Sequence, residues 1–321
     1  MKILGFGRLA VGAGLALILL AGCSGSQGQI GGTGAMPQVG APGASVSPQS
    51  KSRDLLYVSS SDRDNVYVFE FPKIDLIHIL SGFMEPGPAG LCTDGDGNVY
   101  VTDPGTSGSG AVYVYAHGST TGTATLSAPL GAQGCSYDPT TGNLAVVTAG
   151  GDLAIYANAG GNPTIYTFKE MSKFQYCAYD DSGNLFIDGS NDKSSPLVVF
   201  VNGSFKNVAL NKKISPVNLQ WNSGVLVASE ADEGGSQNVY QLKISGTKAQ
   251  VVGTIVLQRR NSAKLAYGAQ NWIQSKILVA PGPNIGTLDF WHYPHGGEPA
   301  QKTSRGNGGY FFGIVVSVAG T

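Results

Sequence analysis

The sequence predicts an all-β protein, a closed propeller of six four-stranded blades. The main observation is a repeat of about 40 to 45 residues that begins near Asp54 and continues to the end of the chain. The composition agrees, because charged residues make up only 13% and the 321 residues include 47 glycines. Few charges and many glycines suit short strands joined by tight turns better than helices.

Each repeat begins with two strands and a turn between them. The clearest copies are Gly90–Val101, Gly134–Val146 and Tyr176–Ile187, in which an Asp is followed by a Gly-Asn pair. These residues supply the local hydrogen bonds and the positive φ that a tight hairpin needs. A third strand rich in Tyr and Val follows, as in Val112–Tyr115, and then a weaker fourth, as in Thr164–Thr167. Four short strands in this length are one propeller blade.

The two ends of the repeat region complement each other. The first copy starts at its second strand, Leu55–Val58, and lacks an inner strand. The chain ends with Phe311–Val318, which reads as an inner strand without a continuation. Counting third strands gives six blades. We therefore expect the C-terminal strand to pair with the N-terminal blade, which closes the ring and removes an exposed sheet edge.

The repeat resembles that of the NHL-repeat and gluconolactonase-like (TolB-like) superfamily of six-bladed propellers. Its units carry a similar line, Gly-x-x-x-Asp-x-x-Gly-Asn-x-Tyr-Val, which residues 88–103 match well and residues 132–147 and 174–188 match fairly. The resemblance implies the fold and leaves the activity open. Calcium-dependent lactonases of the wider superfamily hold their ion with carboxylates and amides at the channel, so the resemblance makes calcium a possible cofactor.

The N-terminal region predicts export and a lipid anchor. Lys2 and Arg8 precede the apolar run Leu9–Leu20, which has the length of a signal-peptide core and is short for a membrane span. The run ends in Leu20-Ala21-Gly22-Cys23, which resembles the lipobox of bacterial lipoproteins and implies lipidation of Cys23. The alternative is an ordinary secretory signal with a chance cysteine.

These features divide the chain into three parts. Residues 1–22 are a lipoprotein signal peptide, residues 23–52 a flexible tether rich in Gly, Ser, Pro and Gln, and residues 53–321 the propeller. We expect a monomer attached to a membrane through lipidated Cys23. That membrane is the outer membrane if the cell has one, as Ser24 after the cysteine suggests, and otherwise the cell surface.

Charge argues against nucleic acid as a partner. The 20 basic residues almost balance the 21 acidic ones, and no basic stripe with interleaved aromatic residues is present. We expect instead a protein, a polysaccharide or a small molecule, bound at the mouth of the propeller channel.

Three cysteines, Cys92, Cys135 and Cys177, occupy equivalent positions in successive inner strands. They could form a thiolate cluster for a soft metal or serve as small buried apolar side chains. We favour packing, because no Cys-x-x-Cys pair is present. The odd count and the expected separation of neighbouring inner strands argue against a disulfide.

Two other patterns suggest metal sites and fail on spacing. Asp94–Asn98 looks like the start of a calcium loop, but Val99 stands at the position that requires Gly, so we interpret the segment as a turn. His292 and His295 form a pair without a third ligand. No nucleophile elbow, phosphate-binding loop or dinucleotide fingerprint is found in the sequence.

The remaining candidates are acidic loop residues at one end of the channel. Asp62, Asp103, Asp188 and Glu230 each lie near the end of a second strand, and Arg259 lies between blades. A ring of carboxylates could hold a hard cation or a polar ligand, although acidic residues also simply form turns, which we favour. We therefore expect a non-enzymatic binding or scaffold module. The alternative is a calcium-dependent lactonase, hydrolase or lyase at this acidic mouth.

Overall fold

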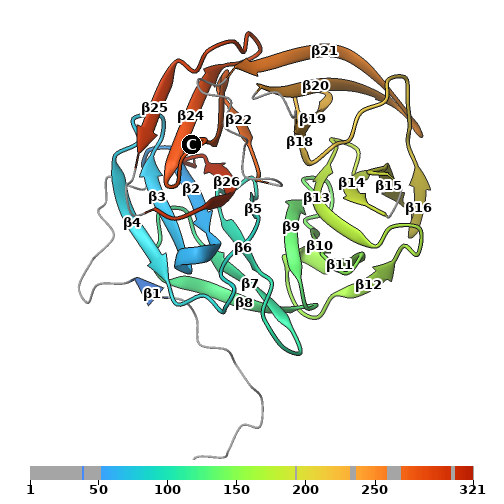
Figure 1. The fold of residues 1–321 in the computed structure, drawn as a ribbon. Coiled ribbons are helices and arrows are strands. Elements are labelled where there is room, and N and C mark those ends of the chain that lie inside the picture. Colours follow the sequence, from blue (N-terminus) through green and yellow to red (C-terminus); the bar gives the residue numbers. More distant parts are fainter. Residues whose placement is uncertain are drawn as a thin grey trace, which may run out of the picture. The chain divides into compact units, whose positions relative to one another are not determined.

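The described residues form a ring of six small antiparallel sheets (Figure 1). The computed structural model describes residues 38–39, 52–191, 194–231, 236–258, 269–304 and 308–320, all within the unit Ala35–Thr321. The signal peptide, Cys23, most of the tether and Arg259 lie outside these residues. No helix in the described part of the chain is long and apolar enough to cross a bilayer.

Blades 1 to 3 follow the repeat in sequence order. Blade 1 contains β26 (Phe311–Ser317), β2 (Leu55–Ser60), β3 (Asn65–Glu70) and β4 (Leu76–Ser81), with β1 (Gln38–Val39) at its outer edge. Blade 2 contains β5 (Leu91–Thr93), β6 (Val99–Asp103), β7 (Gly110–Tyr115) and β8 (Gly122–Ala128). Blade 3 contains β9 (Ala132–Tyr137), β10 (Leu144–Thr148), β11 (Asp152–Tyr156) and β12 (Thr164–Thr167).

Blades 4 to 6 keep the same order from the inner to the outer strand. Blade 4 contains β13 (Lys173–Tyr179), β14 (Leu185–Ser190), β15 (Leu197–Val201) and β16 (Ser204–Asn207). Blade 5 contains β18 (Asn218–Asn222), β19 (Val225–Ala231), β20 (Ser236–Ser245) and β21 (Lys248–Gln258), with β17 (Ala209–Leu210) parallel to β21. Blade 6 contains β22 (Trp272–Gln274), β23 (Ile277–Pro281), β24 (Thr287–His292) and β25 (Gln301–Ser304).

The C-terminal strand closes the ring, as the sequence predicts. Strand β26 pairs antiparallel with β2, with Val315 opposite Tyr57. Ser59 of β2 accepts the N–H of Gly313 at 2.7 Å and donates its hydroxyl to the carbonyl of Ala89, which precedes blade 2. The Ser59 side chain thus connects strand β2 to the C-terminal strand β26 and to the segment that precedes blade 2. The predictions of six blades and of head-to-tail closure are confirmed.

The hairpin turns after the inner strands are built as their sequence predicts. The Asp94 carboxylate accepts the backbone N–H groups of Asp96 and Asn98 at 3.0 and 2.8 Å, and Gly97 has φ +81°. The equivalent Asp180 accepts the N–H of Asn184 at 2.8 Å. Asp94 therefore stabilises a turn, as we interpreted the segment.

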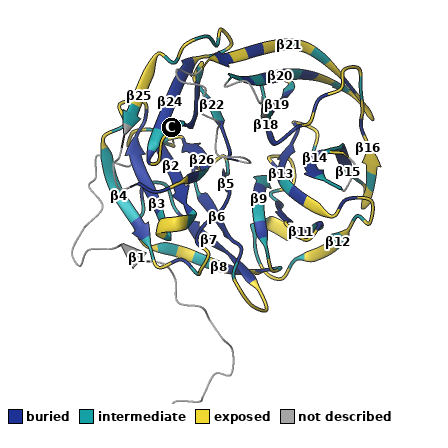
Figure 2. Cartoon of the chain, in the orientation of Figure 1, coloured by how far each residue is buried: buried dark blue, intermediate teal, exposed yellow. Residues whose placement is uncertain are grey.

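The hydrophobic core lies between the blades. The described residues contain six apolar clusters, each between two neighbouring sheets, including one between blades 6 and 1. Inner strands are largely buried, whereas outer strands such as β12 and β16 are mostly exposed (Figure 2). Packing of sheet against sheet holds each inner strand in place, which fixes the side chains that surround the axis.

Candidate functional site

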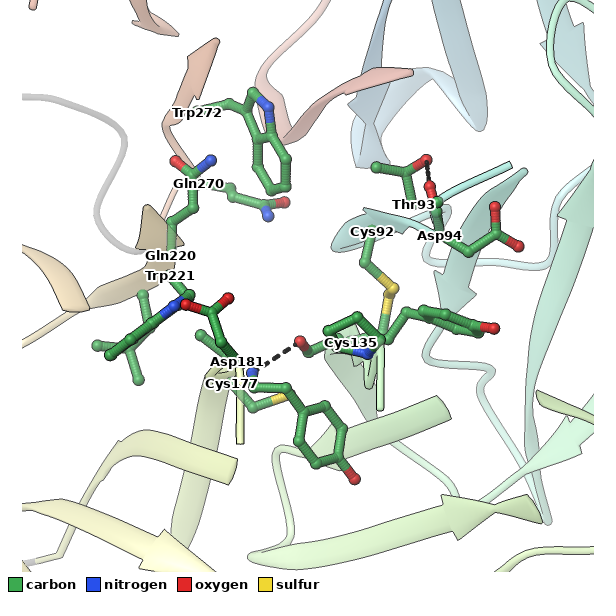
Figure 3. Close-up of a pocket in the computed structure, with 17 residues that line it drawn as sticks. Cys92, Thr93, Asp94, Cys135, Cys177, Asp181, Gln220, Trp221, Gln270 and Trp272 are labelled. Carbon is green, nitrogen blue, oxygen red and sulfur yellow. Dashed lines mark hydrogen bonds between the residues drawn. A yellow bond between two sulfur atoms is a disulfide. The ribbon is translucent and has the colours of Figure 1, made fainter. Parts of the chain in front are cut away.

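A cavity of about 250 Å³, here called the axial cavity, lies where the inner strands converge (Figure 3). It is lined by residues of β5, β9, β13, β18 and β22 and of the hairpin turns that follow three of them. Its exposed rim includes Gly95, Pro139 and Asp181 from those turns. The cavity therefore lies at the end of the ring where inner strands turn into second strands.

On the other side of the cavity, aromatic side chains cross the axis. Tyr176 of blade 4 stacks on Phe312 of blade 1, with ring centroids 6.3 Å apart. The backbone N–H of Gln270 donates to the carbonyl of Phe312 at 2.7 Å. Blades 1 and 4 are opposite each other in the ring, so this contact crosses the axis, on the side away from the hairpin turns that line the axial cavity.

Two glutamines in the cavity wall are used by the fold. Gln220 donates to the carbonyl of Ile273 at 2.9 Å and accepts its N–H at 2.8 Å. Gln270 does the same with Leu91, at 3.0 and 3.2 Å. The Gln220 amide thus links β18 to β22, and the Gln270 amide links the segment before β22 to β5 and, by accepting the N–H of Ile314 at 3.1 Å, to β26. They position the wall and have little hydrogen-bonding capacity left for a ligand.

The indole groups of Trp221 and Trp272 are different. Both line the axial cavity, on the same side as the two glutamines in Figure 3, whereas Cys92 and Asp94 lie across from them. Each indole nitrogen is buried, and neither finds an acceptor among the described residues. A buried donor without a partner costs about 1–3 kcal/mol. Because these nitrogens have no accessible surface, a ligand in the cavity meets the carbon atoms of the two indole rings rather than their N–H groups.

The remaining polar lining is neutral apart from carboxylates. Burial raises the pKa of the Cys177 thiol well above its ordinary value, and burial also raises the pKa of Tyr137, so both stay protonated at neutral pH. The described lining residues include no Lys, Arg or His. Asp181 is exposed at the rim. This arrangement can accept and donate hydrogen bonds, and it disfavours an anionic ligand.

The cysteines correct a prediction. Cys92 and Cys135 form a disulfide between the inner strands of blades 2 and 3, with Cα atoms 5.6 Å apart, so the expectation that these strands lie too far apart is wrong. The strands approach closely because Gly90 has no side chain: a Cβ there would lie 2.5 Å from the carbonyl oxygen of Gln133. Gly90 in fact donates its N–H to that carbonyl at 2.8 Å.

Cys177 remains a free, buried thiol in the wall of the same cavity. Its raised pKa makes it a poor nucleophile, since the thiolate is the reactive form. The described residues contain no group of three or more His, Cys, Asp or Glu side chains placed to hold a metal ion. His295 contributes to a separate hollow of about 710 Å³ near blades 5 and 6, and His292 is exposed.

Asp103 is the last residue of β6 and Asp188 lies two residues before the end of β14, and both are fully buried. Asp103 accepts the N–H groups of Met84 and Gly105 at 2.8 and 3.2 Å, and burial raises its pKa to about 6. Asp188 accepts the N–H of Tyr176 at 2.6 Å, and burial raises its pKa well above the ordinary value. Each carboxyl group therefore binds backbone of its own blade or of the loop just before that blade.

The other two predicted carboxylates also bind nearby structure. Glu230 accepts the N–H of Ser215 and the hydroxyl of Tyr240, both at 2.8 Å. Asp62 accepts the N–H of Tyr310 at 2.7 Å. All four lie at the end of the ring opposite the axial cavity, because second strands run antiparallel to inner strands. The sequence therefore directed attention to one end of the ring, and the cavity is at the other.

Comparison with known proteins supports the architecture. No family model matches the chain, and no curated protein matches its sequence. A chain in the crystal structure of a nidogen/laminin complex is similar, with a TM-score of 0.63 and 12% sequence identity over 84% of this chain and 100% of that chain. At this identity the likeness shows the fold alone. The six-bladed β-propeller is thereby supported, and membership of the NHL-repeat and gluconolactonase-like superfamily stays a prediction.

Proposed function

We propose that the protein is a non-enzymatic binding module, displayed on the cell envelope through lipidated Cys23, and that the axial cavity receives its ligand. The observation that carries this proposal is a hollow on the axis whose wall holds two indole rings, those of Trp221 and Trp272, across from Cys92 and the carboxylate of Asp94. Concave sites with aromatic walls and a few polar groups are the usual form of ligand sites.

The surrounding structure supports ligand binding rather than catalysis. The amides of Gln220 and Gln270 are hydrogen-bonded to backbone, and the disulfide of Cys92 and Cys135 fixes two wall strands. Such a rigid wall lowers the ordering cost of binding. The thiol of Cys177 is held in its protonated, unreactive form by burial. A propeller chain also occurs in the nidogen/laminin complex, so the fold is compatible with a binding role.

The test uses the full chain, purified in detergent and labelled with 5-fluorotryptophan. The sequence contains three tryptophans, so three fluorine signals are expected, and single Trp→Phe variants assign them. Trp291 is an internal reference, because its indole donates to the carbonyl of Gly297 at 3.1 Å inside the core. In a small-molecule library screen we expect hits that shift the Trp272 signal and leave Trp291 unchanged. A screen in which no compound shifts Trp272 would contradict the proposal.

A further inference from the structure

A second cavity adjoins the axial cavity. This inter-blade cavity, of about 440 Å³, lies between blades 4 and 5 and is lined by residues that include Phe186, Val199, Lys206 and Ile244. Trp221 and Asp181 line both cavities. One aromatic ring and one carboxylate therefore belong to the walls of both spaces, on the face of the propeller that carries the hairpin turns.

Trp221 is held as a fixed platform at this junction. Its ring stacks on that of Phe186, with an interplanar angle of 7° and centroids 6.4 Å apart. Its indole nitrogen is buried and has no acceptor among the described residues. A flat ring held from one side offers an apolar surface to a molecule that crosses it.

Size favours a ligand that continues beyond the axis. Sites for small molecules commonly measure about 300–1,000 Å³. The axial cavity, at about 250 Å³, lies just below that range, and the inter-blade cavity, at about 440 Å³, lies within it. A molecule that filled only the axial cavity would be one small ring. A chain of such rings could fill the axial cavity and pass over Trp221 into the second space.

Charge and hydrogen bonding define the chemistry of that chain. The exposed carboxylate of Asp181 accepts hydrogen bonds, and the rings of Trp221 and Trp272 offer apolar carbon surface. A sugar has both hydroxyl donors and an apolar C–H face, so it fits both features. The described axial lining offers no cation, and the inter-blade lining offers only Lys206, so a chain with a negative charge on each unit is disfavoured.

We propose, on the basis of the proposed binding function, that the ligand is a neutral linear oligosaccharide. One sugar ring occupies the axial cavity beside Trp272, and the next units cross Trp221 into the inter-blade cavity. The C–H face of a sugar packs on the indole ring while its hydroxyl groups donate to Asp181.

The experiment measures fluorine signals of the labelled full chain during titration with named probes. The neutral probes are cellohexaose, chitohexaose, maltohexaose and xylohexaose, and each is compared with its disaccharide. Hexagalacturonate tests an anionic sugar chain, and a hexapeptide of Gly, Ala and Pro tests a peptide ligand. We expect at least one neutral hexasaccharide to shift the signals of both Trp221 and Trp272. Its disaccharide should shift Trp272 alone and bind about tenfold more weakly, the equivalent of about one added hydrogen bond and ring contact.

Matched variants locate the effect. Trp221→Ala should reduce hexasaccharide affinity to that of the disaccharide. Trp221→Phe, which keeps a smaller aromatic ring, should have an affinity between those of Trp221→Ala and the wild type. Ile165→Ala is the control, because Ile165 is exposed on the outer strand β12, outside the described lining of either cavity.

The outcomes separate the two proposals. If library compounds shift Trp272 but no neutral hexasaccharide shifts Trp221, the oligosaccharide proposal is overturned and the binding function stands. Preference for hexagalacturonate or for the peptide would also overturn it. If nothing shifts Trp272, both proposals fail.

Discussion

Cys92 and Cys135 join the inner strands of neighbouring blades by a disulfide, two residues beyond the point where Gly90 donates its N–H to Gln133. The bond closes a 43-residue separation that contains nearly the whole of blade 2. It therefore fixes one side of the axial cavity and restricts the unfolded chain. A structural disulfide is also the form of cysteine pairing that an exported protein can maintain.

Removing this disulfide should destabilise the domain strongly. For a loop of this length, chain entropy predicts a loss of about 4 kcal/mol of unfolding free energy in the double variant Cys92→Ala, Cys135→Ala. The matched control Cys177→Ala removes a buried thiol that is not in a disulfide and should cost about 1 kcal/mol. Urea denaturation of the three proteins measures the difference. Equal losses in the double variant and the control would show that the bond contributes nothing beyond packing.

Deleting residues 310–321 should abolish cooperative unfolding. The deletion removes β26, in which Ile314, Val315 and Val316 are almost completely buried, and it leaves β2 as an unpaired inner edge. Val318→Ala, which changes an exposed residue just beyond the strand, should melt as the wild type does. Calorimetry distinguishes the two results. A truncated chain with the melting temperature of the wild type would refute closure by the C-terminal strand.

The blades could be predicted because each hairpin depends on residues that lie close together in the sequence. Each turn depends on residues a few positions apart, such as Asp94 and Asn98, and the repeat places these turns in register. Closure could also be predicted, since a missing first strand and an extra last one, Phe311–Val318, complement each other within any ring.

The axial cavity and the disulfide could not be predicted in the same way, because both depend on contacts between blades. Trp221 and Trp272 come from blades 5 and 6, where the repeat is degenerate, and the sequence gives no sign that their side chains meet at the axis. The disulfide depends on the close approach that Gly90 permits. The available signal was a glycine two residues before Cys92, together with a cysteine, Cys135, at the equivalent position of the next repeat.

Asp188 should make stability fall as pH rises. Burial holds its folded-state pKa well above the unfolded value near 3.8, so the native state binds its proton more tightly. The contribution of this carboxyl group to stability is fully present below the unfolded pKa and is lost as pH rises through the folded pKa. Asp188→Asn removes the titration while keeping an acceptor for the N–H of Tyr176.

The variant should therefore gain stability relative to the wild type between pH 5 and pH 8. Urea denaturation at the two pH values measures the change, and Asp75→Asn, at an exposed carboxylate, is the control. If Asp188→Asn differed from the wild type by the same free energy at both pH values, Asp188 would not be the titrating group.

Calcium should leave the melting temperature unchanged up to millimolar concentrations. A site selective for the folded state would raise it in proportion to the logarithm of the ion concentration above Kd. The carboxyl groups of Asp103 and Asp188 accept backbone N–H groups from their own blades or from the loop just before. Glu230 accepts the N–H of Ser215, in the loop before blade 5. Asp103 and Glu230 use both carboxylate oxygens as hydrogen-bond acceptors, whereas one oxygen of Asp188 is buried without a partner. The described residues place no group of three His, Cys, Asp or Glu side chains around an ion, and calcium takes about six to eight oxygen ligands. A rise with calcium that disappears in Asp103→Asn would instead favour the calcium-dependent hydrolase, with its site at the end of the ring opposite Trp272.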